Sequence, residues 1–370
     1  MKEAIAQNLI RYRKGLGISQ ETLAQRVGMT RQTIINYEKA QTLPDSKSLS
    51  LLAKHLGVTL DDLLRPMDQL SKTTSHFCFR AHSTFTKKPQ FASSIQNLLM
   101  IYTALETAVG LPPYAPESTP CTQLKGNENR IQQIAKLFRA RLGIGDAPIA
   151  NLFEAVEEIG LKVLRLPIEQ KDFFGVSACS ATQGAFVLIN THNISIERQL
   201  FTLAHEIGHL IFHRDEYQDQ LLGSTDGDEE KAREAVANYF ASHLLISQSA
   251  FEQSRQNMHD DLLKLKAYFR VSYATILKRF DELGIKDYSS MIKELRWRYK
   301  RKTGQSLVKD IELEPKLQAQ DFPLNQRYHT LIFEALEQEK ISEFKAAELL
   351  DMTIEALRLE RAKLEIYALA

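Results

Sequence analysis

Two histidines and a glutamate in the middle of the chain are the residues best suited to chemistry. His205, Glu206 and His209 form the pattern H-E-x-x-H within residues 198–213. On an α-helix, side chains four residues apart project from one face, so both imidazoles can bind a single zinc ion. Such a zinc ion polarises a carbonyl group and lowers the pKa of water to about 7, and Glu206 can then act as general base. The pattern therefore indicates zinc-assisted hydrolysis.

The sequence around this motif is typical of a helix with an apolar surface. The apolar neighbours are Leu203, Ala204, Ile207, Leu210 and Ile211. A short pattern of this kind also arises by chance, and the alternative is an amphipathic core helix whose two histidines contact solvent. The apolar helical context favours the metal-binding interpretation.

A hydrolytic zinc site needs a third protein ligand and one open position. The acidic helix expected from residue 228 supplies candidates, and Glu234 begins a face that continues through the small residues Ala237 and Ala241. Small residues allow this helix to pack closely against the first one. Glu229 and Glu230 lie nearer the helix start, where carboxylates commonly interact with the helix dipole. From spacing alone Glu234 could also be a solvated residue, and His213, one turn beyond His209, is a rival ligand.

Residues 198–213 together with residues 234–241, E-A-V-A-N-Y-F-A, resemble the ImmA/IrrE family of zinc metallopeptidases. The resemblance implies that His205, His209 and Glu234 are the zinc ligands and that Glu206 is the catalytic base. Residues 174–177 and 185–190 are similar to the strand region of that family. Family members often have Met-Pro after the Leu-Leu of the second helix, whereas Ile246-Ser247 stand here. His243 falls on the same helix near the site, and we expect it to have a packing role rather than a role in the transition state.

The elements that must position this motif alternate between helix and strand. Apolar periodicity predicts helices over residues 131–141 and 149–159, and short apolar runs predict strands over 161–166 and 186–189. Helices then dominate to about residue 283. A small sheet with helices packed against it is the arrangement that this order favours.

The first 66 residues show a different pattern, that of short helices joined by tight turns. Apolar residues recur at helical spacing from Ile5 to Leu64, and Gly28 stands between two of the helical runs. Ser19, Thr30 and Thr59 each precede a helical run and are the expected N-caps.

Residues 16–40 resemble the lambda-repressor/Xre-type helix-turn-helix, and the resemblance covers about residues 6–64. It implies a recognition helix over residues 30–39, whose N-terminal side chains enter the major groove of DNA. Arg13 and Glu38 are similar to the internal ion pair of that family. The residues expected to read bases are Arg31, Gln32 and Thr33. Those expected to contact phosphates are Gln20, Asn36 and Lys39.

Charge supports a DNA-binding role for this block. The whole chain has 47 Lys and Arg against 46 Asp and Glu, a net charge of +1, which excludes a uniformly basic nucleic-acid-coating protein. Residues 1–66, however, hold ten Lys and Arg against six Asp and Glu, a net charge of +4. Such a basic patch attracts the phosphate backbone. The alternative is a protein-interaction module of the same fold.

The remaining segments are less informative. The prolines between residues 112 and 120 indicate a linker, preceded by a helix over about 91–109. Residues 293–302 are basic with Trp297 and Tyr299 interleaved, and they could bind nucleic acid, although a solvated helix face is the commoner role of such a run. Residues 340–353 are similar to a degenerate second helix-turn-helix whose acidic residues favour docking or dimerisation over DNA contact.

Targeting signals and cysteine usage indicate the compartment. No apolar run is long enough for a transmembrane helix, and the N-terminus lacks a signal-peptide core. Cys78, Cys121 and Cys179 form neither a C-x-x-C pair nor a disulfide framework. We expect a cytoplasmic protein that is associated with the nucleoid when bound to DNA.

We therefore expect a mainly helical α+β protein in four parts. These are an all-α helix-turn-helix domain (1–66), a helical linker region (67–126), a zincin-like metallopeptidase core with a small sheet (127–285), and a helical C-terminal region (286–370). The expected partners are a double-stranded DNA operator and, as implied by the family, a repressor or antitoxin-like protein that is cleaved in a stress or phage-related response. A homodimer is expected because such readers usually address two half-sites.

Two alternatives to this function remain open from the sequence. The first is a non-proteolytic transcription factor whose zinc domain is a sensor or a structural module. The second is an antitoxin-like protein that binds a toxin and its own promoter.

Overall fold

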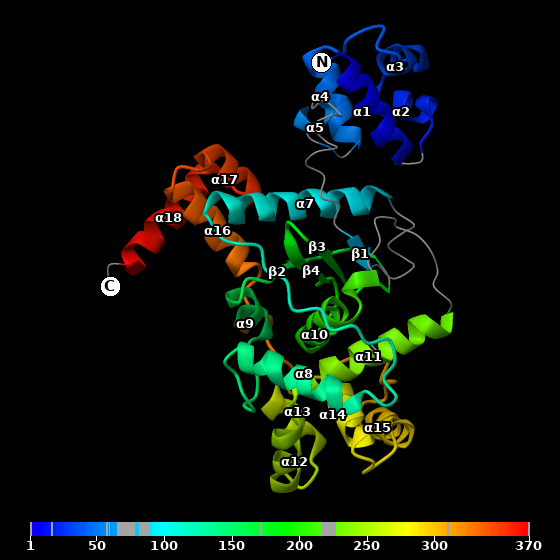
Figure 1. Cartoon of the computed structure of the whole chain (residues 1–370), viewed down its shortest axis with the longest axis vertical. Helices are drawn as coiled ribbons and strands as arrows, with labels where there is room; N and C mark the ends of the chain where they lie inside the picture. The colour runs from blue at the N-terminus through cyan, green and yellow to red at the C-terminus, as the bar shows by residue number, and fades with distance from the viewer. Residues whose placement is uncertain are drawn as a thin grey trace. The chain divides into compact units, whose positions relative to one another are not determined.

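The computed structural model describes residues 2–15, 18–56, 58, 60–64, 78–80, 89–170, 172–216, 227–308 and 311–368 (Figure 1). These residues form two compact units, each with its own internal contacts. The first comprises Met1–Phe77, Ala81–Thr103 and Ser180–Thr182, and the second comprises Cys78–Arg80, Ala104–Cys179 and Gln183–Ala370. In the described residues, each helix is too short or too polar to cross a membrane.

Five short helices build the N-terminal part of the first unit. They are α1 (Lys2–Gly15), α2 (Gln20–Val27), α3 (Arg31–Glu38), α4 (Ser46–Leu56) and α5 (Leu60–Leu64). Each helix contributes one apolar face to a shared core, because none is long enough to be stable alone. The core includes Ile5, Leu9, Leu23, Val27, Ile34, Leu52 and Leu63.

The turn between α2 and α3 forms as the sequence predicts. The Ser19 side chain accepts a hydrogen bond from the Thr22 backbone N–H at the start of α2, and the Thr30 side chain caps α3 in the same way. Gly28 ends α2 in the left-handed conformation with φ of 69°, which a residue without a Cβ adopts easily. Thr59, the third expected cap, lies outside the described residues.

The second unit is built on a sheet with the strand order β1-β3-β4-β2. The strands are β1 (Cys78–Arg80), β2 (Lys162–Leu166), β3 (Gly175–Ser180) and β4 (Gly184–Asn190). β2 pairs parallel with β4, with Val163 opposite Val187, and β1 pairs antiparallel with β3, with Phe79 opposite Ala178. The predicted small sheet and mainly helical α+β class are confirmed. β1 was not predicted, because three residues are too few to show an alternating pattern.

Helices α10 and α11 pack against each other beside this sheet, and α8 packs on α11 (Figure 1). The helices of this region are α8 (Glu128–Arg141), α9 (Leu152–Glu158), α10 (Ile196–Phe212), α11 (Gly227–Leu245), α12 (Gln248–Asn257), α13 (Leu262–Phe269) and α14 (Tyr273–Glu282). α10 is buried on almost every side, in agreement with the apolar context of its motif. One continuous core joins α8, α10, α11 and the sheet.

The proline-containing segment before α8 differs from a free linker. It follows α7 (Pro89–Ala108), close to the predicted helix over 91–109, and within the second unit its backbone is hydrogen-bonded to α10 and β4. The Thr119 N–H donates to the Ile211 carbonyl at 2.7 Å, and the Ala185 N–H donates to the Tyr114 carbonyl at 2.6 Å. The proline-rich composition suggested a linker, and the hydrogen bonds could not be predicted because Ile211 and Ala185 are distant from this segment in sequence.

The C-terminal part is helical, as the charge pattern indicated. It contains α15 (Tyr288–Thr303), α16 (Gln326–Glu337), α17 (Glu343–Leu349) and α18 (Ile354–Ala368), with a short 3-10 turn at Ala319–Asp321 before α16. Another 3-10 turn, at Arg214–Glu216, follows α10. α17 and α18 contact each other and correspond to the region in which a second, degenerate helix-turn-helix was expected. The domain boundaries inferred from composition remain predictions.

Candidate metal centre and nucleic-acid interface

Helix α10 brings His205 and His209 together. Ser195 caps its N-terminus by accepting a hydrogen bond from the Arg198 backbone N–H, which leaves the motif in the regular, buried part of the helix. The two Nε2 atoms lie 2.9 Å apart. The spacing of four residues thus produces the side-by-side arrangement that the sequence predicts.

Glu234 completes the group from the neighbouring helix α11. Its carboxylate oxygens lie 3.3 Å from His205 Nε2 and 3.2 Å from His209 Nε2. The two helices approach closely at Gly208, where an added Cβ would lie only 3.2 Å from the Cα of Ala237. Gly208 is therefore the residue that lets the carboxylate of α11 reach the histidines of α10.

Each histidine is oriented by a partner on its other ring nitrogen. Asn238 Oδ1 lies 3.0 Å from His205 Nδ1, and His213 Nδ1 lies 2.9 Å from His209 Nδ1. His213 Nε2 in turn lies 2.9 Å from the Cys121 carbonyl oxygen, which can only accept a hydrogen bond. His213 therefore donates through Nε2 and accepts through Nδ1, and His209 donates through its own Nδ1.

This chain of hydrogen bonds fixes the tautomers of both motif histidines. Because each Nδ1 carries the proton, the lone pairs of both Nε2 atoms point toward one another and toward Glu234. Two unprotonated nitrogens 2.9 Å apart beside a carboxylate form a donor set that a cation can bind. Ligand atoms in a tetrahedral zinc site lie roughly 3.3–3.5 Å from one another, close to the separations seen here. The donor set fits a zinc ion.

His213 was a rival for the third ligand position. Among the residues that the structure describes, the group that could hold a metal ion consists of His205, His209 and Glu234, and His213 is buried with 1% exposure. Both of its ring nitrogens face the hydrogen-bond partners already described. The geometry thus brings Glu234 to the site and gives His213 an orienting position.

The electrostatics of the group are those of a cation-binding site. Burial alone would raise the pKa of Glu234, but the adjacent His205 and His209 lower it far below its usual value. Burial alone would lower the pKa of His205, but the contact with Glu234 raises it. The site therefore holds a carboxylate ready to pair with positive charge.

Glu206 follows His205 on α10 and is 6% exposed. Ser177, a fully buried residue of β3, donates a hydrogen bond from Oγ to Glu206 Oε2 at 2.6 Å. A hydrogen bond from a rigid strand limits the rotamers of the carboxylate. No individual role was predicted for Ser177, since nothing in its local sequence pattern shows that it faces the motif.

His243 lies in a separate buried network. Its Nε2 atom is 2.5 Å from Arg279 Nη1 and 3.5 Å from Glu282 Oε2. Burial, together with the charge of Arg279, lowers the pKa of His243 to about 4 in spite of the opposing effect of Glu282. The side chain is neutral at physiological pH and holds α11 to α14, which agrees with the packing role expected for it.

The helix-turn-helix presents its candidate DNA contacts on and around α3. Arg31 and Gln32 are exposed, and so is Lys39 directly after the helix. Gln32 Nε2 donates to Asn36 Oδ1 at 3.0 Å, which aligns two polar side chains along the helix. The hydroxyl of Thr33 is hydrogen-bonded to that of Thr30 at 2.8 Å and so takes part in the helix cap.

Gln20 and the predicted ion pair are joined through hydrogen bonds to Glu38. Arg13 Nη2 donates to Glu38 Oε2 at 3.0 Å, and its Nε donates to the other carboxylate oxygen. The internal Arg13–Glu38 pair is confirmed. Gln20 Nε2 also donates to Glu38, at 2.7 Å, so one of its two amide hydrogens is used inside the unit.

Family models match both parts of the chain that contain these residues. Residues 9–63 match the helix-turn-helix family, and residues 156–281 match the IrrE N-terminal-like domain. An uncharacterized HTH-type transcriptional regulator of Methanothermobacter thermautotrophicus is 50% identical over 52 residues, which are 14% of this chain and 75% of the relative. A second such regulator, from Methanocaldococcus jannaschii, is 38% identical over 58 residues, which are 15% of this chain and 88% of the relative.

Two transcriptional regulators of known structure match this chain at low sequence identity. A Mycobacterium tuberculosis transcriptional regulator is 21% identical with a TM-score of 0.24, and the match covers 50% of this chain and 47% of that one. This chain thus spans about half the length of that regulator. ComR from S. thermophilus, solved in complex with DNA and its signalling peptide ComS, is 12% identical with a TM-score of 0.23, and the match covers 98% and 99% of the two chains.

The chain belongs to the helix-turn-helix family of transcriptional regulators. Its second unit carries a domain of the IrrE/ImmA-like metallopeptidase family, which contains the His205–His209–Glu234 group. It is therefore a two-part regulator that combines a DNA-binding type of domain with a peptidase-type domain.

Proposed function

We propose that this regulator is a zinc-dependent endopeptidase that acts on a protein partner. The observation that carries the proposal is the convergence of His205, His209 and Glu234 with both Nε2 lone pairs directed inward. A group without a metal would not need outer partners that fix both tautomers. The match to the IrrE N-terminal-like domain supports the same chemistry.

The residues would divide the reaction between them. His205, His209 and Glu234 would hold the zinc ion, which when bound supplies a Lewis acid for the peptide carbonyl. Glu206 would take a proton from the attacking water molecule and deliver it to the leaving amine. Ser177 would keep the Glu206 carboxylate in place through its hydrogen bond of 2.6 Å.

The first unit would direct this activity to a promoter. Arg31, Gln32 and Thr33 would read bases of an operator, while Asn36, Lys39 and Gln20 would contact phosphates, and a homodimer would address two half-sites. The cleaved protein would be a repressor or an antitoxin-like partner in a stress or phage-related response. These events would take place in the cytoplasm, at the nucleoid when the protein is bound to DNA.

Glu206→Gln tests the proposal. Because Glu206 is not in the ligand group, the variant should retain one zinc ion per chain, measured by elemental analysis. Cleavage of candidate repressors, followed by mass spectrometry, should fall by about 10²–10⁴-fold because the general base is lost. Glu229→Gln is a matched control on the exposed start of α11 and should leave cleavage unchanged. Equal cleavage by Glu206→Gln and the native protein would refute the assignment.

Two other outcomes would identify other functions. If no partner is cut while operator DNA is bound with sequence preference, the protein is a non-proteolytic regulator whose zinc domain is a sensor or a structural module. If the chain instead forms a complex with a toxin and binds its own promoter, it is an antitoxin-like protein.

A further inference from the structure

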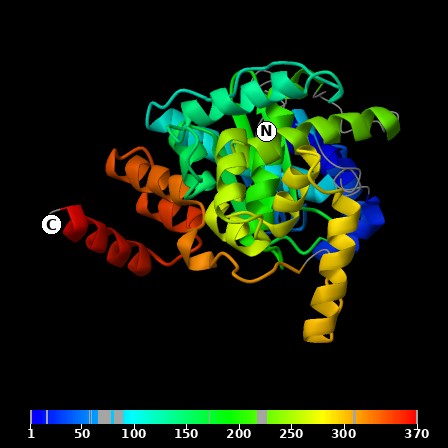
Figure 2. The ribbon, with the colours of Figure 1, turned by 90° about the horizontal axis from the view of Figure 1, so that it is seen from below.

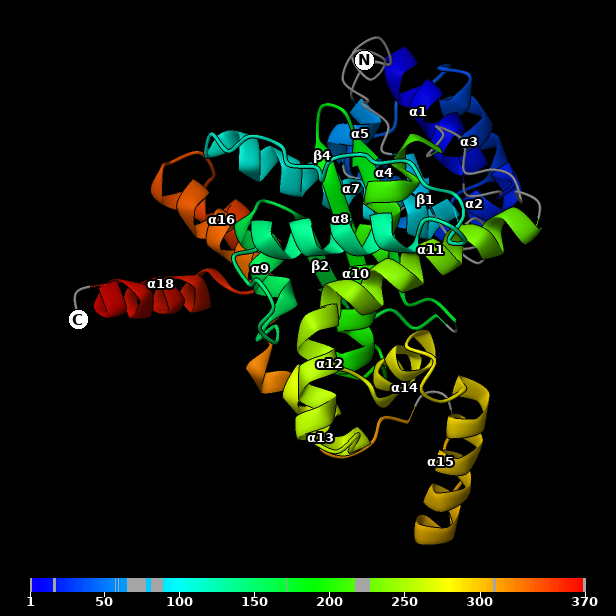
Figure 3. The same cartoon turned by 60° about the horizontal axis from the view of Figure 1, so that its bottom comes forward.

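Helix α15 is attached to the second unit along one side. Asp287 caps its start by accepting a hydrogen bond from the Ser290 backbone N–H at 2.9 Å, and Gly304 ends it with φ of 73°. Met291 is the buried residue of the helix, and Ile292 and Leu295 pack beside it against the core. Figures 2 and 3 show the rest of α15 extending away from α12–α14.

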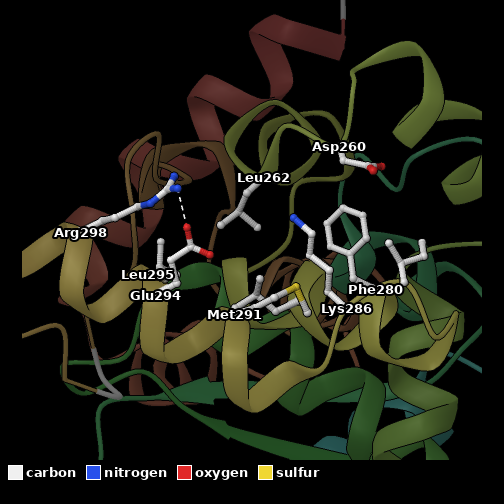
Figure 4. A pocket seen from close by; sticks show the side chains of 10 residues that line it. Asp260, Leu262, Phe280, Lys286, Met291, Glu294, Leu295 and Arg298 are labelled. Atoms are coloured by element: carbon white, nitrogen blue, oxygen red, sulfur yellow. Dashed lines mark ion pairs between the residues drawn. The ribbon is translucent and has the colours of Figure 1, made fainter.

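The attached side of α15 lines a small pocket. Met291 and Leu295 face Leu262 and Phe280 across a cavity of about 140 Å³, and an ion pair between Arg298 and Glu294 lies at its rim (Figure 4). This apolar contact fixes the rotation of the helix about its axis. The packing of the attached side therefore holds the opposite side of the helix toward solvent.

That opposite side carries a basic face with a single aromatic ring. Its members are spaced at i, i+3, i+4, i+7 and i+8, so they share one face of the helix. All five are exposed, and Trp297, the one tryptophan of the chain, is 60% exposed. The guanidinium of Arg301 lies 5.3 Å from the centre of the Trp297 ring. The basic face consists of Lys293, Arg296, Trp297, Lys300 and Arg301.

The basic face keeps a net positive charge, although the charge of Lys293 is near enough to Asp287 to contribute to the lowered pKa of that carboxyl group. The ion pair formed by α15 joins Arg298 to Glu294, and both of these lie on the flank next to the pocket. In the described part of the chain, the four cations of the basic face form no ion pair with a carboxylate. Four neighbouring positive charges on a protruding helix create a field that attracts a polyanion.

We propose that the basic face of α15 binds the sugar–phosphate backbone of duplex DNA, as a second contact besides α3. A helix-turn-helix regulator operates on DNA, so duplex phosphates are the polyanion that such a face meets. Lysine and arginine bind phosphates without regard to base sequence, and the exposed Trp297 ring adds contact area against the sugars. The contact would increase affinity without specifying the operator. The proposal rests on the DNA-binding part of the proposed function and is independent of zinc and of peptidase activity.

The test uses the full chain with four substitutions, Lys293→Gln, Arg296→Gln, Lys300→Gln and Arg301→Gln. A matched control carries Arg298→Gln and Lys302→Gln, which remove exposed cations of the same helix outside the basic face. Both variants are also made with Arg31→Ala and Gln32→Ala, so that failure of the recognition helix cannot be mistaken for failure of α15. Binding is measured by fluorescence anisotropy on a labelled duplex of arbitrary sequence over a range of salt concentrations.

The quadruple variant should bind this duplex more weakly, and the slope of log K against log salt should become shallower by about 2–4, since each phosphate contact contributes roughly 0.9. The control should keep the native slope, and circular dichroism should show the same melting temperature for all variants because the substituted side chains are exposed. An unchanged slope in the quadruple variant, or an equal change in the control, would overturn the proposal. The proposal would also be overturned if the native protein bound a single strand more tightly than the duplex. A quadruple variant that lost binding to phosphatidylserine vesicles but kept native duplex binding would overturn it as well.

Discussion

Replacing His213 by phenylalanine isolates the part of the metal centre that lies behind the ligands. His213 is 1% exposed and links His209 Nδ1 to the Cys121 carbonyl through two hydrogen bonds of 2.9 Å. Phenylalanine fills a similar volume but accepts no hydrogen bond. In the variant, zinc binding requires His209 to keep its proton on Nδ1, where this proton would be buried without an acceptor. The metal-free protein escapes this cost, because His209 can move the proton to Nε2 and donate it to Glu234.

The size of the effect follows from this difference. A buried donor without a partner costs about 1–3 kcal/mol, and this cost sets the upper limit of the effect, because the metal-free variant buries an unpaired Nδ1 lone pair instead. Converted at 1.36 kcal/mol for each factor of ten, the affinity for zinc should fall by about 5- to 150-fold. Outer partners of metal-binding histidines generally contribute about 10- to 100-fold, which is the same range.

The assay is a competition titration of the full-length protein against a chromophoric zinc chelator. His213→Gln is the matched variant, because its side-chain oxygen can still accept a hydrogen bond from His209, and it should recover most of the affinity. Native affinity in His213→Phe would refute the argument from tautomers. A complete loss of zinc in His213→Phe, together with stoichiometric zinc in Glu234→Ala, would show that His213 is the ligand and Glu234 is not.

Two further predictions concern buried charges. Glu38→Ala should reduce the stability of the helix-turn-helix unit by about 2–3 kcal/mol, because Arg13 loses the carboxylate that pairs with its charge. The Arg13 side chain is 11% exposed and keeps some access to water, which limits the loss. Hydrogen exchange of α1–α3 would measure the change. The pKa of His243 is 6.5 in the unfolded chain and about 4 in the folded protein. The unfolding free energy should therefore decrease by at most about 3 kcal/mol as the pH falls from 6.5 to 4, because the unfolded chain takes up the proton first. Denaturant titration would measure this decrease.

Each of these predictions has its control. Glu21→Ala removes an exposed acid of α2 and should leave hydrogen exchange in α1–α3 unchanged, whereas equal exchange in Glu38→Ala would contradict the role of the ion pair. For His243 the comparison is with His243→Gln, which cannot take up the proton. Glu157, whose pKa burial raises to about 7, acts in the opposite direction in both proteins and cancels in the difference. The same pH profile in both would show that His243 does not cause the loss.

The sequence predicted the features that depend on a single helix or turn. The side-by-side placement of His205 and His209 follows from 3.6 residues per helical turn, and the caps at Ser19 and Thr30 and the turn at Gly28 follow from local backbone preferences. These features can be predicted without knowing which elements pack against them. The family resemblances extended the prediction from single helices and turns to two domains.

The groups that complete the sites could not be found in this way. Spacing along α11 left the role of Glu234 open, and its meeting with the motif depends on the close approach at Gly208. Ser177 reaches Glu206 from a strand 29 residues earlier, and the Cys121 carbonyl reaches His213 from a segment that composition assigned to a linker. These contacts are set by packing between elements that are distant in sequence.

The basic run near the end of α15 shows the same division. Composition established that residues 293–302 are rich in positive charge, but not where that charge lies. The packing of Met291 and Leu295 against the core fixes the rotation of the helix and turns Lys293, Trp297 and Lys300 outward together. Residue types and their spacing along the chain thus show which side chains have suitable chemistry and which neighbours share a helical face. The tertiary structure decided which of them meet, because burial of apolar surface, not spacing along the chain, sets how the helices pack.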